Sequence, residues 1–125
     1  MKYDQFIATV AERAGVPRDE AEKLTRATLQ VLAQRLTGGE AKDLRSQMPK
    51  ELQPDLTKEQ EPAERFDVDE FARRVAERSG TDEADAGAGV MAVLATIHDA
   101  VTPGEFDDVL AQLGREFKEL VDAAT

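Results

Sequence analysis

The chain has no cysteine and no tryptophan, one histidine, and only 5% aromatic residues. Without cysteine it can form neither disulfides nor thiolate metal sites, which fits the reducing cytoplasm where we expect the protein to reside. No segment approaches the ~20 apolar residues of a membrane-spanning helix. Residues 1–15 are charged throughout and lack the apolar core of a secretion signal. These absences predict a small cytoplasmic protein that does not span a membrane.

Positive charge is also scarce, with 16 basic side chains against 26 carboxylates and a net charge of −10. An acidic surface repels phosphate backbones and anionic lipids. We therefore expect no binding to nucleic acid or to a membrane face. The excess of carboxylates serves solubility, or it attracts a protein partner with a basic face.

Residues that commonly carry chemistry are few. His98 is the only histidine, and one histidine without cysteine cannot form an ordinary zinc site. Ser46 and Ser79 are the only serines, and neither lies in a nucleophile elbow. Acidic residues around Asp19 and Asp82 lie where helices are expected to begin, and the helix dipole explains them without a metal. We expect no catalytic residues, no metal and no cofactor, and hence no enzyme.

What the chain does contain is a repeat. The segment VAERAG at residues 10–15 returns as VAERSG at residues 75–80, and the register of 65 residues continues without a gap. One further set of identical pairs is Thr37, Gly39, Glu40, Asp43, Gln47 and Glu51 with Thr102, Gly104, Glu105, Asp108, Gln112 and Glu116. Apolar positions and turn residues recur together, so both copies are predicted to have the same local structure.

Each copy is predicted to form three helices. The first two helices are expected at about 3–14 and 17–36 in copy one, and at about 68–79 and 82–101 in copy two, because apolar residues recur at helical spacing. Gly15 and Gly80 suit the left-handed residue that ends a helix. No run of β-branched residues alternates with polar ones, so no sheet is expected.

Start signals sharpen these boundaries. Thr37-Gly-Gly-Glu40 and Thr102-Pro-Gly-Glu105 are capping boxes that should begin the third helix of each copy. In these boxes the glutamate is expected to return to the N–H of the cap. Further start signals are Pro17 at a first helical position, Thr81 as an N-cap, and Asp67 as a carboxylate cap. Pro49 and Gly114 hold equivalent places where the third helix could kink or shorten.

A unit of about 55 residues is marginal on its own, and two units are too few for a solenoid. We therefore predict one all-α domain over residues 1–125. Repeat one covers residues 1–56, a linker covers about 57–66, and repeat two covers 67–125. The six helices are expected to pack as two three-helix units about a pseudo-two-fold axis.

The copies differ most in their second helix, where Glu22–Arg26 of copy one aligns with Gly87–Met91 of copy two. The helix of copy two is apolar nearly all round from residue 86 to 95, as is typical of a helix buried on all sides. Gly87 and Gly89 are expected to let another backbone approach closely. Two interpretations remain open: the helix is the central element of the domain, or part of it forms an interaction surface. That surface would comprise Ala84, Gly87, Ala88, Met91 and Ala95.

Two features have simple structural interpretations. Arg13 and Arg78 repeat faithfully and are expected to act as helix-end cations in ion pairs between helices, with a pair of anion sites as the alternative. His98, in the last turn of its helix, is expected to be structural or exposed.

The segments YDQFIATVAERAG, TGGEAKDLRSQMPKEL, FDVDEFARRVAERSG and TPGEFDDVLAQLGREFKELV resemble a bacterial family of uncharacterised helical proteins, domain-of-unknown-function family 2267. The resemblance covers nearly the whole chain. Met48 stands where the family pattern has leucine, and Gly114 departs from its proline. The resemblance implies a small helical cytoplasmic protein with no known catalytic residues and a loose association with stress responses.

These observations favour a non-enzymatic protein–protein interaction module, associated with stress adaptation, that binds a protein partner or itself. The alternative is a small-molecule or metal-binding protein with a pocket between the repeats, near Met91 and His98.

Overall fold

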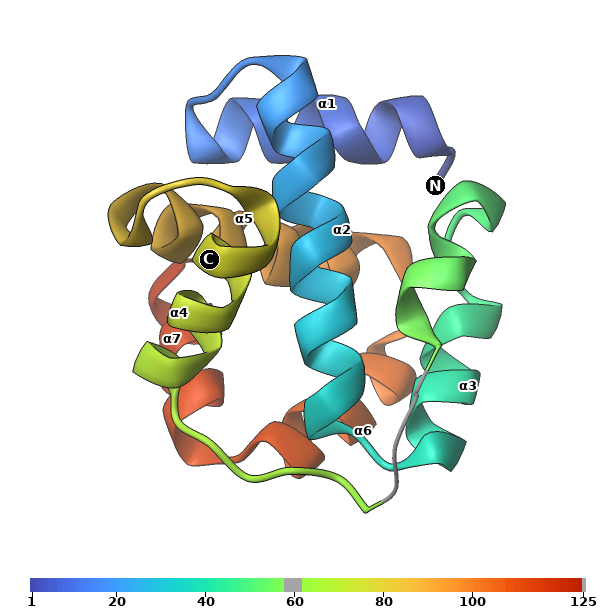
Figure 1. The fold of residues 1–125 in the computed structure, drawn as a ribbon. Coiled ribbons are helices and arrows are strands. Elements are labelled where there is room, and N and C mark those ends of the chain that lie inside the picture. The colour runs from blue at the N-terminus through green and yellow to red at the C-terminus, as the bar shows by residue number, and fades with distance from the viewer. Residues whose placement is uncertain (58–61, 125) are drawn as a thin grey trace.

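The computed structural model describes residues 1–57 and 62–124, and within them every regular element is helical. The order along the chain is α1 (Tyr3–Ala14), α2 (Arg18–Arg35), α3 (Gly38–Ser46), the 3₁₀ helix η1 (Lys50–Leu56), α4 (Val68–Ser79), α5 (Glu83–Ala100), α6 (Pro103–Leu113) and α7 (Arg115–Ala124). Figure 1 shows their arrangement. The all-α prediction is confirmed. Of the predicted linker, residues 58–61 lie outside the described part of the chain.

The prediction of six helices was wrong, because the described residues form eight helical elements. The third helix of each half is divided in two, at Pro49 in the first half and at Gly114 in the second. Proline has no N–H for the helical ladder and its ring clashes with the preceding turn. Gly114 has φ 97° and ψ −178°, a conformation that side chains disfavour, so α6 must end there. Two different residues therefore produce the same interruption.

Most predicted helix ends are confirmed. Gly15 and Gly80 both adopt the left-handed conformation, with φ 69° and 72°, and end α1 and α4. Asp67 caps α4 by accepting a hydrogen bond from the backbone of Glu70. Two starts differ by one residue. Pro17 is the residue before α2 rather than its first turn, and Asp82 caps α5 in place of the expected Thr81.

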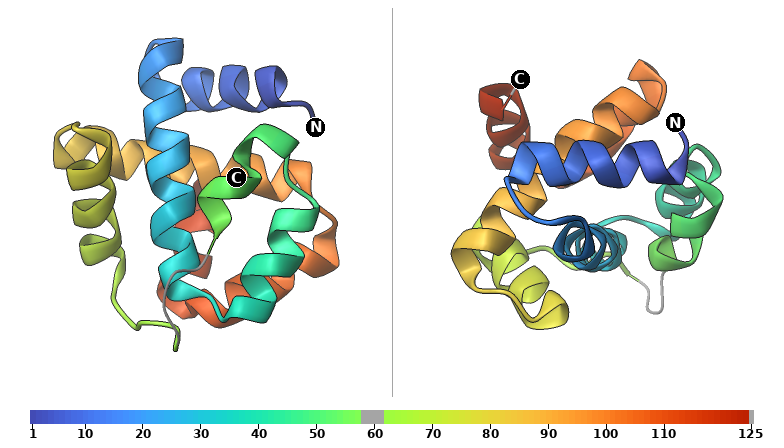
Figure 2. Two further views of the ribbon diagram at one scale, coloured as in Figure 1. Left: turned by 45° about the vertical axis from the view of Figure 1, so that its right-hand side comes forward. Right: turned by 90° about the horizontal axis from the view of Figure 1, so that it is seen from above.

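Two long helices form the centre of the molecule. In Figure 1, α5 passes behind α2, and the two helices are in contact where they cross. Helices α1 and α4 each pack against both of them, while α3 contacts α6. The two further views in Figure 2 show the same arrangement from other sides. The elements of residues 1–56, the first half, and of 67–124, the second half, therefore pack into one another rather than side by side.

The element boundaries of the two halves correspond. Helical elements begin at residues 3, 18, 38 and 50 in the first half and at 68, 83, 103 and 115 in the second, a constant difference of 65 residues. The first two pairs also have equal lengths, 12 and 18 residues. Positions separated by 65 residues are called equivalent below.

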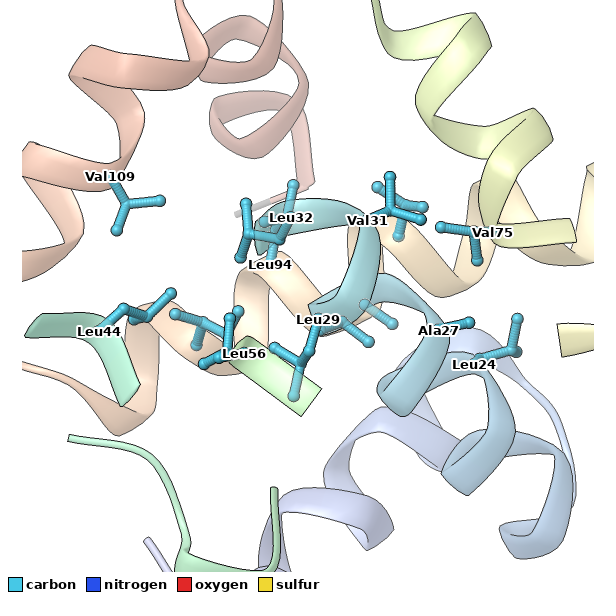
Figure 3. Close-up of a cluster of buried hydrophobic side chains, with 14 of the residues drawn as sticks. Leu24, Ala27, Leu29, Val31, Leu32, Leu44, Leu56, Val75, Leu94 and Val109 are labelled. Atoms are coloured by element: carbon cyan, nitrogen blue, oxygen red, sulfur yellow. The ribbon is translucent and has the colours of Figure 1, made fainter. Parts of the chain in front are cut away.

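The core is a single cluster of buried apolar side chains, to which both halves contribute (Figure 3). Equivalent positions meet at the crossing of α2 and α5, where Leu24 packs against Gly89. A Cβ added to Gly89 would lie 2.9 Å from Leu24 Cδ2. The expectation for the two glycines was wrong: Gly89 makes room for a side chain rather than a backbone, and apart from its chain neighbours and the backbone of α5 no described atom lies within 4 Å of a Cβ at Gly87.

Helix α5 is a central element, as one interpretation of its composition predicted, but it shares the centre with α2: nine of its 18 residues are buried, against ten of 18 in α2. It contacts α1, α2, α4, α6 and α7. Within the described residues, no helix is both long and apolar enough to cross a membrane.

Candidate functional site

The predicted interaction residues lie along one stripe of α5, at different depths. Ala84 and Ala88 are exposed, Gly87 and Met91 are half-buried, and Ala95 is buried. Ala95 therefore does not belong to a surface. The other four residues lie in the N-terminal part of α5, which neighbouring helices leave partly uncovered.

A groove of about 540 Å³ runs beside this stripe, and we call it the α5 groove. Residues of α4, α5 and α7 line it: Val68, Asp69, Ala72, Glu83, Gly87, Val90, Met91 and Leu120. Apolar side chains form much of its walls, polar atoms contribute nearly half of the exposed surface, and its two exposed charged residues, Asp69 and Glu83, are both acidic. All of this lining comes from the second half. The groove thus includes Met91, but it does not lie between the halves as the alternative function required.

The equivalent positions of the first half carry a polar network. The Tyr3 hydroxyl donates to Glu22 at 2.6 Å, and Arg18 forms ion pairs with Asp4 and Glu22. Arg26 binds the Asp55 carboxylate at 2.7 Å, and its guanidinium lies 5.7 Å from the Tyr3 ring centre.

In the α5 groove Asp69 repeats Asp4 and Glu83 replaces Arg18, but three other equivalents are shorter or apolar. Glu22 corresponds to Gly87, Arg26 to Met91, and Asp55 to Leu120. The second half therefore has, in place of a set of interlocking charged side chains, a groove in which apolar side chains lie beside two exposed carboxylates.

Three other residues that the sequence singled out make contacts with neighbouring side chains. His98 is exposed and stacks on Phe106, with ring centres 4.5 Å apart. Arg13 forms an ion pair with Asp99 at 2.6 Å, which confirms the expected contact between helices. Arg78 instead donates to the neutral side chain of Gln30 at 3.0 Å. Both arginines join α1 or α4 to a central helix of the other half.

A second site lies between α3 and α6, and sequence reasoning did not identify it. Glu40 and Glu105 occupy equivalent positions, and their side chains meet there at 9% and 8% exposure. One carboxylate oxygen each from Glu40, Glu105 and Asp108 lie within 4.8 Å of one another. Glu40 Oε1 and Glu105 Oε2 are buried and receive no hydrogen bond from the described residues. We call Glu40 and Glu105 the carboxylate pair.

The geometry of the helix starts explains why these glutamates face each other. Thr37 and Thr102 act as N-caps by accepting hydrogen bonds from the backbone of Glu40 and Glu105, as predicted. In a complete capping box the glutamate would accept the N–H of the threonine. That prediction was wrong, because glutamines of the opposite half accept those N–H groups instead.

The two glutamine contacts are reciprocal. The Thr37 N–H donates to Gln112 Oε1 at 2.9 Å, and the Thr102 N–H donates to Gln47 Oε1 at 2.8 Å. Since the threonine N–H groups are occupied, the glutamate side chains turn into the contact between α3 and α6.

Burial, followed by a hydrogen bond with the Glu40 carboxyl and by its charge, raises the pKa of Glu105 to about 8. Asp43 and Asp108 add negative charge in the same direction. An ionised carboxylate in such a place is costly unless a cation or a proton compensates it. The site therefore favours uptake of positive charge at neutral pH.

The signal for this site was present in the repeat. Both copies contain Glu-x-x-Asp, as Glu40-Ala-Lys-Asp43 and Glu105-Phe-Asp-Asp108, and this spacing places both carboxylates on one helical face. The sequence pattern did not indicate which helices pack against each other. Only the contact between α3 and α6 brings the two motifs together.

The fold and its sites define a small all-helical protein built around two crossed central helices. A family model described as an uncharacterised conserved protein, DUF2267, matches residues 3–120. The chain therefore belongs to the DUF2267 family, and the resemblance seen in the sequence motifs is confirmed. A search of curated proteins finds no match.

Proposed function

We propose that this protein is a non-enzymatic interaction module that uses the α5 groove to bind a segment of a protein partner. The observation that carries the proposal is the difference between equivalent surfaces. Charged side chains bond one another in the first half, whereas Gly87, Met91 and Leu120 leave an open groove with apolar side chains in the second. A groove with half-buried apolar side chains can receive an apolar anchor of a partner.

We also propose that the two halves of the chain are two copies of one helical unit related by a pseudo-two-fold axis. Helix boundaries with a constant offset support this, as do the reciprocal contacts of Thr37 with Gln112 and of Thr102 with Gln47. In such an arrangement one surface is free to change while its equivalent maintains the fold.

The chemistry of the groove indicates the kind of partner. Its apolar walls suit one or two apolar side chains, and the exposed Asp69 and Glu83 suit basic residues beside them. We propose a partner segment with apolar anchors flanked by lysine or arginine. Complementary charge would also speed association with a protein of net charge −10. A role in stress adaptation and a cytoplasmic location remain predictions from the sequence.

Site-specific photo-crosslinking can test the groove. A benzophenone side chain is placed at Ala88, which is exposed beside the groove, or at the equivalent exposed residue Lys23 as a matched control. In cells of the natural host we expect a discrete adduct from position 88 that position 23 does not give. Added salt should weaken the adduct, since screening shortens the reach of charges to about 10 Å at 0.1 M.

A graft provides the second control. The changes Gly87→Glu and Met91→Arg install the side chains of the first half, and the adduct from position 88 should then disappear while the helical circular dichroism is kept. An adduct of the chain with itself would identify a second copy as the partner, and light scattering would confirm a dimer. Equal adduct patterns from positions 88 and 23 would contradict the proposal.

The alternative class, a small-molecule or metal-binding protein, is favoured by one observation, the carboxylate pair between α3 and α6. It concerns a different part of the molecule and could coexist with the interaction role.

A further inference from the structure

We propose that Glu40, Glu105 and Asp108 bind a hard divalent cation, of the class of Mn²⁺, Mg²⁺ and Ca²⁺, between α3 and α6. One oxygen from each residue lies within 4.8 Å of the other two. Oxygens that share one ion at about 2.0–2.6 Å are at most about 4–5 Å apart. The three carboxylates are therefore already spaced as ligands of a single ion.

Burial distinguishes this cluster from the many acidic residues on the surface. Glu40 and Glu105 are more than nine-tenths buried, and each has an oxygen that receives no hydrogen bond from the described residues. Buried polar atoms are normally partnered, and a buried unpaired charge is especially costly. A ligand that supplies positive charge at this point satisfies both carboxylates at once.

The third ligand connects the site to solvent. Asp108 is exposed, so an ion can enter from its side and keep water molecules in the remaining coordination positions. Asp43, the equivalent of Asp108, adds negative charge near Glu105 from the opposite half. The arrangement is open on one side and enclosed on the other, as a binding site requires.

The ligand atoms indicate the class of ion. The cluster contains carboxylate oxygens and neither histidine nitrogen nor cysteine sulfur. Such ligands suit hard cations, whereas zinc and copper sites in proteins usually contain nitrogen or sulfur. The ion would tie α3 of the first half to α6 of the second, and binding to the folded state alone stabilises a fold.

Manganese binding to the whole protein tests the site. Chelator-treated protein at pH 7.5 is titrated with MnCl₂, and free Mn²⁺ is followed by electron paramagnetic resonance. We expect one site in the native protein, and affinity at least about tenfold weaker in Glu105→Gln. The matched control is Glu83→Gln, an exposed glutamate in the acidic first turn of α5, which should bind as the native protein does.

Thermal unfolding gives a second readout. Mn²⁺ should raise the melting temperature of the native protein and of Glu83→Gln, but not that of Glu105→Gln. Ca²⁺ and Mg²⁺ should compete with Mn²⁺, while K⁺ at the same ionic strength should not. Because Glu105 is buried, Asp108→Asn at the exposed ligand serves as a further variant that does not disturb the core, and it should also weaken binding.

Two results would overturn the proposal. Absence of specific Mn²⁺ binding to the folded native protein would show that the carboxylate pair holds a proton instead. Binding that is unchanged in both Glu105→Gln and Asp108→Asn would place the ion among other surface carboxylates.

Discussion

In the first half Glu22 and Arg26 take part in a polar network on the outer side of α2, whereas their equivalents Gly87 and Met91 line a groove on α5. Both helices have 18 residues, and each contacts the first and the last helical element of its own half, but that last element is the 3₁₀ helix η1 beside α2 and the α-helix α7 beside α5. The side chains on the two outer faces differ as well. Burial in the core holds equivalent positions to similar chemistry, but an outer face can change without disturbing the fold.

The crossing of α2 and α5 shows the opposite case, where equivalent residues must differ. Leu24 and Gly89 touch, and two leucines could not occupy this contact. Leu24→Ala should lower the free energy of unfolding by about 3 kcal/mol, because it removes a fully buried side chain. Chemical denaturation measures this change.

The partner variant provides the control. Gly89→Ala should cost about 1 kcal/mol, because overpacking against Leu24 outweighs the gain in helix propensity. The double variant should be less destabilised than the sum of the two single ones, since the new methyl group fills part of the cavity. Strict additivity would argue against this contact.

Arg35 breaks the equivalence in another way, because position 100 of the second half is alanine. Arg35 is buried, donates to the backbone oxygens of Gln112 and Leu113, and lies near the rings of Phe66 and Phe117. It therefore satisfies the end of α6 from the opposite half.

Arg35→Ala should lower the free energy of unfolding by about 2–3 kcal/mol, since it removes the guanidinium donor from the buried Leu113 carbonyl and the part-buried Gln112 carbonyl. Exposed Arg115→Ala, by comparison, should have little effect. If the two changes lowered the free energy of unfolding equally in urea denaturation, the buried contacts of Arg35 would stabilise the fold no more than an exposed ion pair does.

The carboxylate pair gives a pH dependence that no surface carboxylate can give. The pKa of Glu105 is raised to about 8 in the folded state, above the usual 4.5. Its contribution to stability is therefore complete below about pH 4.5 and is lost as pH rises through about 8. Between pH 5 and pH 9 the metal-free protein should lose on the order of 2 kcal/mol of stability.

Denaturation at a series of pH values, in the presence of a chelator, measures this loss. Glu105→Gln should flatten the profile over that range, and Glu83→Gln should not. A native profile that rises from pH 5 to pH 9 would have the wrong sign for a buried carboxyl of raised pKa.

The smallest expected effect concerns the groove itself. Gly87 lies inside α5, and apart from its chain neighbours and the backbone of α5 no atom of the described residues comes within 4 Å of an added Cβ. Gly87→Ala should therefore raise the free energy of unfolding by about 0.5–1 kcal/mol, through helix propensity alone. Thermal melts would show an increase in the melting temperature, in contrast to the decrease expected for Gly89→Ala. A decrease for both would mean that position 87 is as crowded as position 89.

Sequence reasoning predicted the helices well and their contacts less well. Gly15, Gly80 and the threonine caps mark boundaries through local geometry, which a sequence records directly. The division of the third helices at Pro49 and Gly114 was predicted as a kink or a shortening, because a proline can either bend or end a helix, but the further helical element that follows each break was not predicted. The use of Gly89 and the meeting of Glu40 with Glu105 depend on which faces pack together, and periodicity alone does not specify that.

The central claim is that the two halves meet carboxylate to carboxylate in a buried place. Titration of the metal-free protein, with glutamate side-chain carboxyls labelled with ¹³C, tests it most directly. We predict one carboxyl signal with a titration midpoint near pH 8, assigned to the pair through its loss in Glu105→Gln. If every glutamate in the folded protein titrated below about pH 5, as exposed carboxyls do, the claim would be contradicted.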